Sequence, residues 1–212
     1  MEGFLEKELS SNDHGVEAES ESTGVQIKHR PTSADFTELL EKRESIVVIH
    51  GVSKKAMTFI ENGFQAIKVG EKSIISIDLE TWGRIIRDPN GNFYKAIANT
   101  FARRMRLPFK IDDVWNEENL NAINFSEFIR EVILRTPQRQ VVFVLDHVDS
   151  LLGTILQNEF FDILRSFHNN RATDTHVGWE RLTVVLITRT DPNRFIIEGT
   201  ESPFSVGSWL IL

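Results

Sequence analysis

Two short segments of the chain carry residue types that could bind a phosphate group and a metal ion. The first runs from Gly51 to Thr58 and follows a strand-like apolar segment at 46–49. A phosphate-binding loop has the pattern G-x-x-x-x-G-K-[ST], in which backbone N–H groups and the lysine contact phosphate and the hydroxyl holds Mg²⁺. When the first glycine of this pattern is aligned with Gly51, Thr58 falls at the [ST] position. Ala56 then stands at the second glycine and Met57 at the lysine. The segment therefore predicts a phosphate loop whose working residues are largely replaced.

The second segment is an apolar, β-branched run at 141–145 that ends in Asp146. Such a run is typical of a buried parallel strand with a carboxylate at its carboxyl end. In nucleoside triphosphatases this aspartate reaches Mg²⁺, and a glutamate after it orients the attacking water. Here the next residue is His147, and loss of the carboxylate removes a term of about 10²–10⁴ in rate. We therefore expect Thr58 and Asp146 as metal ligands, but no useful hydrolysis and no catalytic residue.

Other polar residues extend the candidate site. Lys54 and Lys55 are the basic residues nearest to the missing lysine, but both precede its position, so exposed loop lysines are the simpler interpretation. Thr188 ends an apolar run at 182–188, at the edge where ligands bind in open α/β sheets. No cofactor is assigned, and ATP or ADP with Mg²⁺ would bind only weakly. The candidate nucleotide-binding residues are Gly51, Lys54, Lys55, Thr58, Asp146 and Thr188.

Histidines offer an alternative metal site. His50, His147 and His168 come from different predicted elements and lack the H-x-x-x-H spacing of helical zinc sites. The nearby carboxylates are Asp146 and Asp149, which flank His147 in the sequence. Hydrogen-bonded histidines are the simpler interpretation, and no Ser-His-Asp nucleophile elbow occurs.

Apolar runs and helical periodicity alternate along the chain and predict the elements that position these residues. Parallel pairing through right-handed crossovers then follows, which gives a three-layer α/β sandwich with a mainly parallel five-stranded sheet. A capping box at Thr32 and Asp35 begins the first helix, Asn124 is expected to cap another, and Trp209 on the last strand is a candidate partner contact. The predicted strands are 46–49, 73–78, 141–145, 182–188 and 208–212, and the main helices begin near Pro31, Ala56, Asn92, Phe125 and Gln157.

The composition of the chain limits which partners it could bind and which compartment suits it. The chain has 212 residues, no cysteine and a formal net charge of −7. The absence of cysteine excludes disulfides and thiolate chemistry and fits a reducing compartment. An acidic balance argues against nucleic acid as the main partner, and no apolar run is long enough to span a membrane. A cytoplasmic protein with a protein partner is the plain interpretation.

The chain divides into a tail and one domain. Residues 1–23 carry seven acidic side chains against Lys7, with serines between them, so this segment is expected to be disordered. Residues 24–212 have the length of a single α/β domain.

In this order, the segments resemble the AAA-like P-loop ATPase domains of bacterial, especially cyanobacterial, multidomain signalling proteins. The resemblance implies ATP binding at 51–58, Mg²⁺ between Thr58 and Asp146, a catalytic glutamate where this chain has His147, and γ-phosphate sensing near Thr188. Relatives continue into a lid, which is absent up to Leu212. The segments that carry the resemblance are 28–31, 74–79, 124–134, 142–152, 160–172, 181–187 and 202–207.

The substitutions at Met57 and His147 favour a pseudo-ATPase, a scaffold retained as a regulatory or protein-interaction module. A nucleotide-binding switch without turnover, built on Gly51, Thr58 and Asp146, is the first alternative. A slow ATPase in which Lys54 or Lys55 and His147 take over the lost roles is the second, so enzyme activity stays open with the balance against it.

Overall fold

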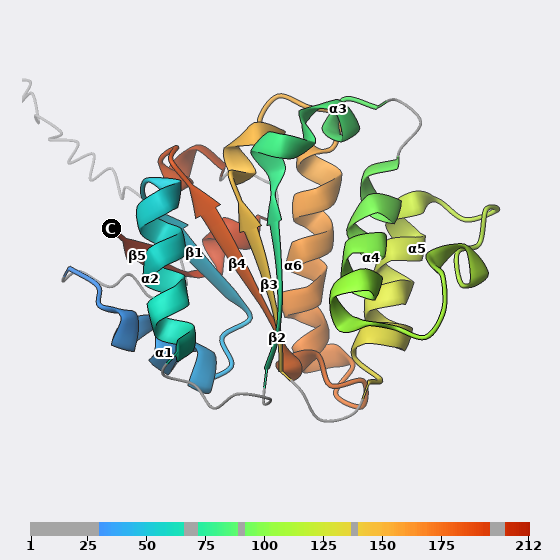
Figure 1. The fold of residues 1–212 in the computed structure, drawn as a ribbon, viewed down its shortest axis with the longest axis horizontal. Coiled ribbons are helices and arrows are strands. Elements are labelled where there is room, and N and C mark those ends of the chain that lie inside the picture. Colours follow the sequence, from blue (N-terminus) through green and yellow to red (C-terminus); the bar gives the residue numbers. More distant parts are fainter. Residues whose placement is uncertain (1–29, 66–71, 89–91, 137–139, 196–201) are drawn as a thin grey trace, which may run out of the picture.

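A twisted sheet of parallel strands forms the centre of the protein (Figure 1). The computed structural model describes residues 30–65, 72–88, 92–136, 140–195 and 202–212. The strands lie in the order β2-β3-β4-β1-β5, and every pair is parallel. This arrangement confirms the predicted α/β class and the five-stranded parallel sheet. The strands are β1 (Ile46–His50), β2 (Lys72–Asp78), β3 (Gln140–Asp146), β4 (Leu182–Thr188) and β5 (Ser208–Ile211).

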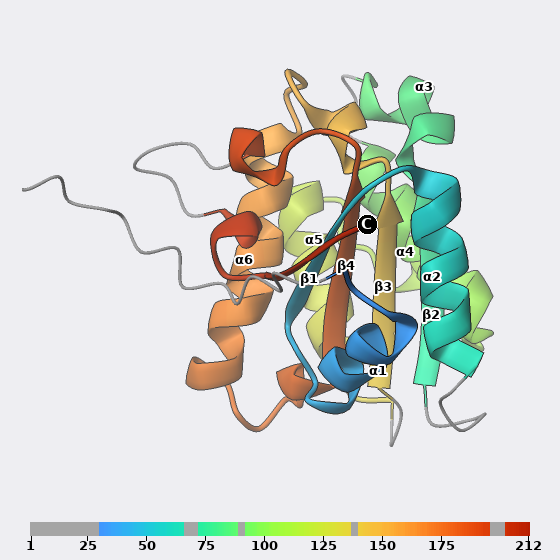
Figure 2. The ribbon, with the colours of Figure 1, turned by 90° about the vertical axis from the view of Figure 1, so that its left-hand side faces the viewer.

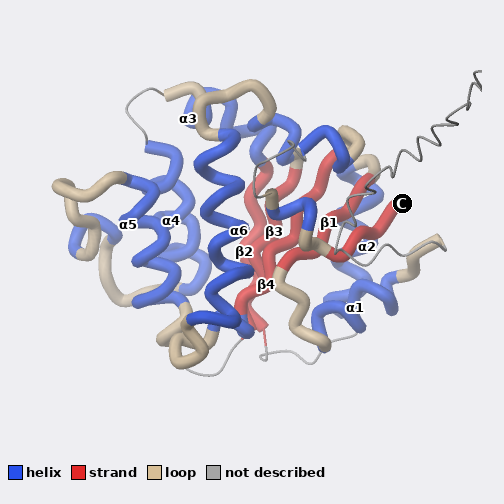
Figure 3. The backbone as a smooth tube through the Cα atoms, turned by 180° about the vertical axis from the view of Figure 1, so that it is seen from behind, coloured by secondary structure: helices blue, strands red, loops and turns tan. Residues whose placement is uncertain are grey.

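Helices cover both faces of the sheet, so the protein has three layers (Figures 2 and 3). One face packs on α4, α5 and α6 and holds the larger, aromatic-rich core, and the other packs on α1 and α2 over a smaller, mainly aliphatic core. All residues of β3 and β4 are buried, as expected for strands covered on both faces. The helices are α1 (Ser33–Glu41), α2 (Ser53–Gln65), α3 (Gly83–Ile86), α4 (Asn92–Met105), α5 (Asn121–Glu127) and α6 (Gln157–Thr173).

Local sequence signals account for several element boundaries. The capping box predicted at Thr32 and Asp35 is present at the start of α1. α5 passes into a π-helix at Phe128–Ile133, so the single helix expected from Phe125 starts earlier and changes its winding. Asn124 does not cap it: the side chain lies inside α5 and bonds both the N–H and the carbonyl of Asn116. That expectation was wrong because the amide serves a loop-to-helix contact.

Two further expectations are corrected by the packing. α2 begins at Ser53, two residues after Gly51, and not near Ala56. The reason is that Ala56 is fully buried in the core between α2 and the sheet. The apolar periodicity of the helix therefore extends back to the first residues after β1. Trp209 is not an exposed partner contact: it is buried, and its Nε1 donates to the Phe204 carbonyl at 2.9 Å. Within the described residues, no helix combines the length and apolar character needed to cross a bilayer.

Candidate functional site

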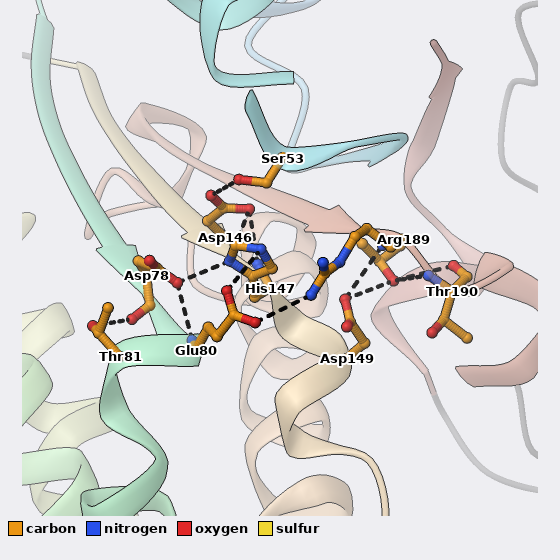
Figure 4. A network of polar contacts seen from close by, with 10 residues as sticks. Ser53, Asp78, Glu80, Thr81, Asp146, His147, Asp149, Arg189 and Thr190 are labelled. Atoms are coloured by element: carbon orange, nitrogen blue, oxygen red, sulfur yellow. Dashed lines mark hydrogen bonds and ion pairs between the residues drawn. The ribbon is translucent and has the colours of Figure 1, made fainter. Parts of the chain in front are cut away.

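The carboxyl ends of β2, β3 and β4 bring together a network of polar side chains (Figure 4). β2 and β3 pair in a register that sets Asp78 directly beside Asp146. Because parallel strands end at the same edge, residues distant in the sequence meet here. This edge is where ligands bind in open α/β folds.

Asp146 is held by the first residue of α2. Ser53 Oγ donates to Asp146 Oδ2 at 2.5 Å, and the His147 backbone N–H donates to Oδ1 at 2.9 Å. The aspartate is 5% exposed. A hydroxyl on the first helical turn beside a strand-end carboxylate is the pair that holds Mg²⁺ in phosphate-loop proteins. In this structure Ser53, rather than Thr58, faces Asp146.

His147 lies between two carboxylates of the neighbouring strand. Its Nδ1 is 2.8 Å from Asp78 Oδ1, and its Nε2 is 3.4 Å from Glu80 Oε2. The residue is 7% exposed and has a left-handed backbone with φ of 55°. Histidine is among the non-glycine residues enriched in that conformation, so the turn after β3 points the imidazole towards β2.

The end of β4 contributes the remaining part of the network. Thr188 Oγ1 and the Arg189 backbone N–H each lie 3.3 Å from Asp149 Oδ1. The Arg189 guanidinium reaches Glu80 Oε1 at 3.3 Å. The predicted site residues Asp146 and Thr188 therefore belong to one network that spans three strands.

Gly51 lies at the same edge, where its backbone is already engaged. Its N–H donates to the Thr188 carbonyl at 3.0 Å. A Cβ added at Gly51 would come within 3.1 Å of Leu212 Cβ, so glycine allows the strand to turn closely past that residue. Only Val52 then separates Gly51 from α2.

Lys54, Lys55 and Thr58 lie elsewhere, in a groove of 610 Å³ between α2 and the start of α1. Pro31, Thr32, Ser33, Val52, Phe59 and Asn62 complete its lining. Thr58 is exposed and donates its hydroxyl to the Lys54 carbonyl at 3.0 Å. It lies five residues beyond Ser53, which is about 7.5 Å along the helix axis. The predicted metal ligands Thr58 and Asp146 therefore lie in different places. Of the six candidate residues, Lys54, Lys55 and Thr58 line the groove, and Gly51, Asp146 and Thr188 lie at the carboxyl edge of the sheet.

A magnesium nucleotide fits this arrangement only in part. The Ser53 hydroxyl and the Asp146 carboxylate suit a divalent cation. The phosphates, by contrast, require a loop of several residues before the helix and a lysine on its first turn. Here two residues connect β1 to α2, and the lysines of the first turn line the groove beside α1. The residues of this chain therefore suit the Mg²⁺ ion of a magnesium nucleotide but not its phosphates.

Sequence reasoning missed Ser53, Asp78 and Glu80. A usable signal was present for Asp78, which ends an apolar strand just as Asp146 does. Glu80 follows by two residues, and its N–H donates to Asp78 Oδ1 at 3.0 Å. Ser53 was hidden because the phosphate-loop pattern assigned its position to a loop.

Comparisons with known proteins agree with this fold. A family model described as an AAA-like domain matches residues 15–212. This match begins inside the segment 1–23 that was expected to be a tail, which lies outside the described residues. No curated protein matches the chain at a significant level.

Solved structures share the fold at low sequence identity. The Cdc6p protein of Pyrobaculum aerophilum matches with a TM-score of 0.52 and 15% identity, over 87% of this chain and 46% of its own length. The ORC2 protein of Aeropyrum pernix, in ADPNP–ADP complexes, matches with a TM-score of 0.57 and 13% identity, over 85% of this chain and 46% of its own length. The chain thus spans less than half of either protein. Drosophila ORC bound to DNA matches with a TM-score of 0.48 and 13% identity, over 98% and 52% of the two chains, which is too weak to carry an inference.

Proposed function

This chain belongs to the AAA-like domain family, and we propose that it is a catalytically impaired member that acts as a regulatory or protein-interaction module. The proposal assigns the domain to a multidomain signalling protein of bacterial type, in the cytoplasm, with a protein rather than a nucleic acid as its partner. The net charge of −7 supports the last point.

The observation that carries the proposal is the short connection between β1 and α2. A phosphate loop works because its backbone N–H groups surround the phosphates and its lysine reaches them. In this chain the Gly51 N–H is bonded to Thr188, and helical structure begins at Ser53. Burial of Ala56 in the core favours the helical conformation over an open loop. The His147 imidazole is turned towards the end of β2, where Nδ1 contacts Asp78 and Nε2 lies 3.4 Å from Glu80.

Exposed apolar side chains support a role in protein binding. Val114, Leu120 and Ile123 lie on the connection from α4 to α5 and at the start of α5, and Leu120 is 69% exposed. Contiguous exposed apolar surface marks protein-binding sites, and these three residues fall within one segment of the sequence, 114–123. This segment is the partner surface that we favour.

A nucleotide-binding switch is the second candidate, and two observations favour it. The Ser53–Asp146 pair suits Mg²⁺, and the groove beside Lys54, Lys55 and Thr58 has the volume of a small-molecule site. A nucleotide could bind across both places if the residues before α2 rearranged. A slow ATPase would additionally require Nε2 of His147 to face the attacking water.

Calorimetric titration of Mg-ATP and Mg-ADP into the purified chain, with phosphate release measured alongside, tests these alternatives. The pseudo-ATPase proposal predicts no heat at millimolar nucleotide and no phosphate release. Binding in the micromolar range that is lost in Asp146→Ala and kept in Thr58→Ala would establish the switch instead. Phosphate release that is lost in His147→Ala would establish the slow ATPase.

A gain-of-function variant gives an independent check on the same proposal. Ala56→Gly with Met57→Lys restores the motif letters without lengthening the connection after Gly51. We expect this pair of changes to produce no nucleotide affinity. Micromolar Mg-ATP binding by the variant would show that the segment can reopen into a phosphate loop.

A further inference from the structure

We propose that His147 and Glu80, oriented by Asp78, form a binding site for a divalent transition metal such as Zn²⁺. The three side chains lie at the carboxyl ends of β2 and β3, and one ligand atom from each can be chosen so that all lie within 4.8 Å of one another. This site adjoins the Ser53–Asp146 pair but shares no ligand with it and requires no nucleotide, so it goes beyond the proposed function.

The hydrogen bond to Asp78 determines which imidazole nitrogen is available. Nδ1 lies 2.8 Å from Asp78 Oδ1, a distance at which the Nδ1–H donates to the carboxylate. Nε2 then carries the lone pair. Metal-binding histidines in proteins are held in this way, with the second ring nitrogen donating to a carboxylate. Asp78 therefore acts as a positioning residue, and Nε2 is the metal ligand.

The distance between Nε2 and Glu80 suits a shared metal ion. Zn²⁺ lies about 2.0–2.2 Å from histidine nitrogen and carboxylate oxygen, so two ligands of a tetrahedral site are about 3.4 Å apart. Nε2 and Glu80 Oε2 are 3.4 Å apart, longer than a normal hydrogen bond between these atoms. Arg189 contacts the other oxygen, Oε1, at 3.3 Å. This leaves Oε2 for the metal, and water would complete the coordination.

Two further observations support a cation here. The turn that carries Glu80 is held in place, because the Glu80 N–H donates to Asp78 Oδ1 and the Thr81 hydroxyl donates to the Asp78 carbonyl. The network also carries excess negative charge: the carboxylates of Asp78, Glu80, Asp146 and Asp149 are opposed by the guanidinium of Arg189. The buried imidazole selects the metal, since Mg²⁺ and Ca²⁺ prefer oxygen ligands, whereas Zn²⁺ and Co²⁺ accept nitrogen.

The test uses the untagged full chain after removal of metal with a chelator. Zn²⁺ is titrated calorimetrically, Co²⁺ is titrated while the visible absorption of tetrahedral cobalt is recorded, and Mg²⁺ is the comparison ion. We expect Zn²⁺ and Co²⁺ to bind at one site per chain and Mg²⁺ to give no signal in the cobalt competition. Glu80→Gln and His147→Ala should each abolish the cobalt band.

Matched variants separate the site from general histidine or carboxylate binding. His176→Ala removes an exposed histidine outside the network and should leave the cobalt band unchanged. Asp78→Asn keeps both ligands and should weaken Zn²⁺ binding by about 10–100-fold. If no Zn²⁺ binds at millimolar concentration, or if binding survives Glu80→Gln and His147→Ala, the proposal is overturned. Glu80 is exposed, so its variant should fold even if the His147 variant does not.

Discussion

At the amino end of the sheet, two long polar side chains donate to backbone carbonyls, whereas at the carboxyl end the carboxylates of Asp78 and Asp146 are held by other side chains. The Gln140 side-chain amide donates to the Leu40 carbonyl, and Arg171 donates to the carbonyls of Arg43 and Leu182. At the other end, Ser53 binds Asp146, and His147 binds Asp78. Backbone acceptors are tied to the fold, but contacts between side chains can be exchanged for a ligand. The two ends thus separate residues that hold the structure from residues that could do chemistry.

The largest effect that this comparison predicts is at Arg171. Arg171→Met removes two charge-assisted hydrogen bonds and leaves the carbonyls of Arg43 and Leu182 without that donor. At about 1.5 kcal/mol for each bond, we expect the free energy of unfolding to fall by about 3 kcal/mol. Urea denaturation monitored by circular dichroism measures the loss.

Two variants serve as controls for Arg171. Arg135 forms an exposed pair with Glu131, so Arg135→Met should cost about 0–1 kcal/mol. Arg171→Lys keeps the charge but loses the planar pair of donors and should recover only part of the stability. If the free energy of unfolding falls equally in Arg171→Met and Arg135→Met, the contacts at the amino end stabilise the fold no more than an exposed ion pair does.

An intermediate effect is expected at Ser53. Ser53→Ala removes the hydroxyl that donates to the buried Asp146 carboxylate, which should lower the free energy of unfolding by about 1.5–3 kcal/mol. The exposed hydroxyl of Thr58 bonds within its own helix, so Thr58→Ala should have little effect. The same denaturation series compares them, and a larger loss at Thr58 than at Ser53 would contradict the assignment of the carboxyl-end contact.

The smallest effect is a pH dependence at the amino end. Burial, with added repulsion from Arg165 and Arg171, holds the pKa of His168 below its usual 6.5. The unfolded chain therefore takes up this proton first as the pH falls, so the stability that His168 confers is complete above about 6.5 and declines below it. Ser45 Oγ lies 2.6 Å from His168 Nδ1, a contact that suits the neutral ring.

Unfolding midpoints measured from pH 7.5 down to pH 5 check this sign. His168→Asn should flatten the part of the slope that lies below pH 6.5. His176→Asn, at an exposed histidine, should leave that slope unchanged. A chain that becomes more stable as the pH falls through this window would refute the assignment.

Sequence patterns predicted the sheet well because each strand is specified locally. The run at β4 was assigned with its observed bounds, Leu182–Thr188, and all of its residues are buried as its β-branched composition indicated. Parallel pairing followed from the alternation of strands and helices and is confirmed. These features depend on apolar periodicity, which a single sequence displays directly.

The candidate site was less accessible because it depends on register and on where one helix begins. Asp78 meets His147 only through the pairing of β2 with β3, and no spacing in the sequence encodes that meeting. The start of α2 was misplaced because the phosphate-loop pattern outweighed the buried periodicity of Ala56 and Ile60. The motif pattern located the helix start by residue letters alone, whereas packing determines where the helix starts.

Because of the strand order, the part of the carboxyl-end network that β2 carries should open more often than the part that β3 carries. Among the described residues, β2, which ends at Asp78 just before Glu80, pairs only with β3 and forms one edge of the sheet, whereas β3 and its Asp146 lie between two neighbours. Local opening in proteins takes least free energy at segments with few tertiary contacts. Backbone amides of β2 should therefore exchange with deuterium sooner than those of β3. Each opening of β2 would carry two carboxylates away from His147, so the network should assemble and separate on the timescale of an edge strand while the interior of the sheet stays closed.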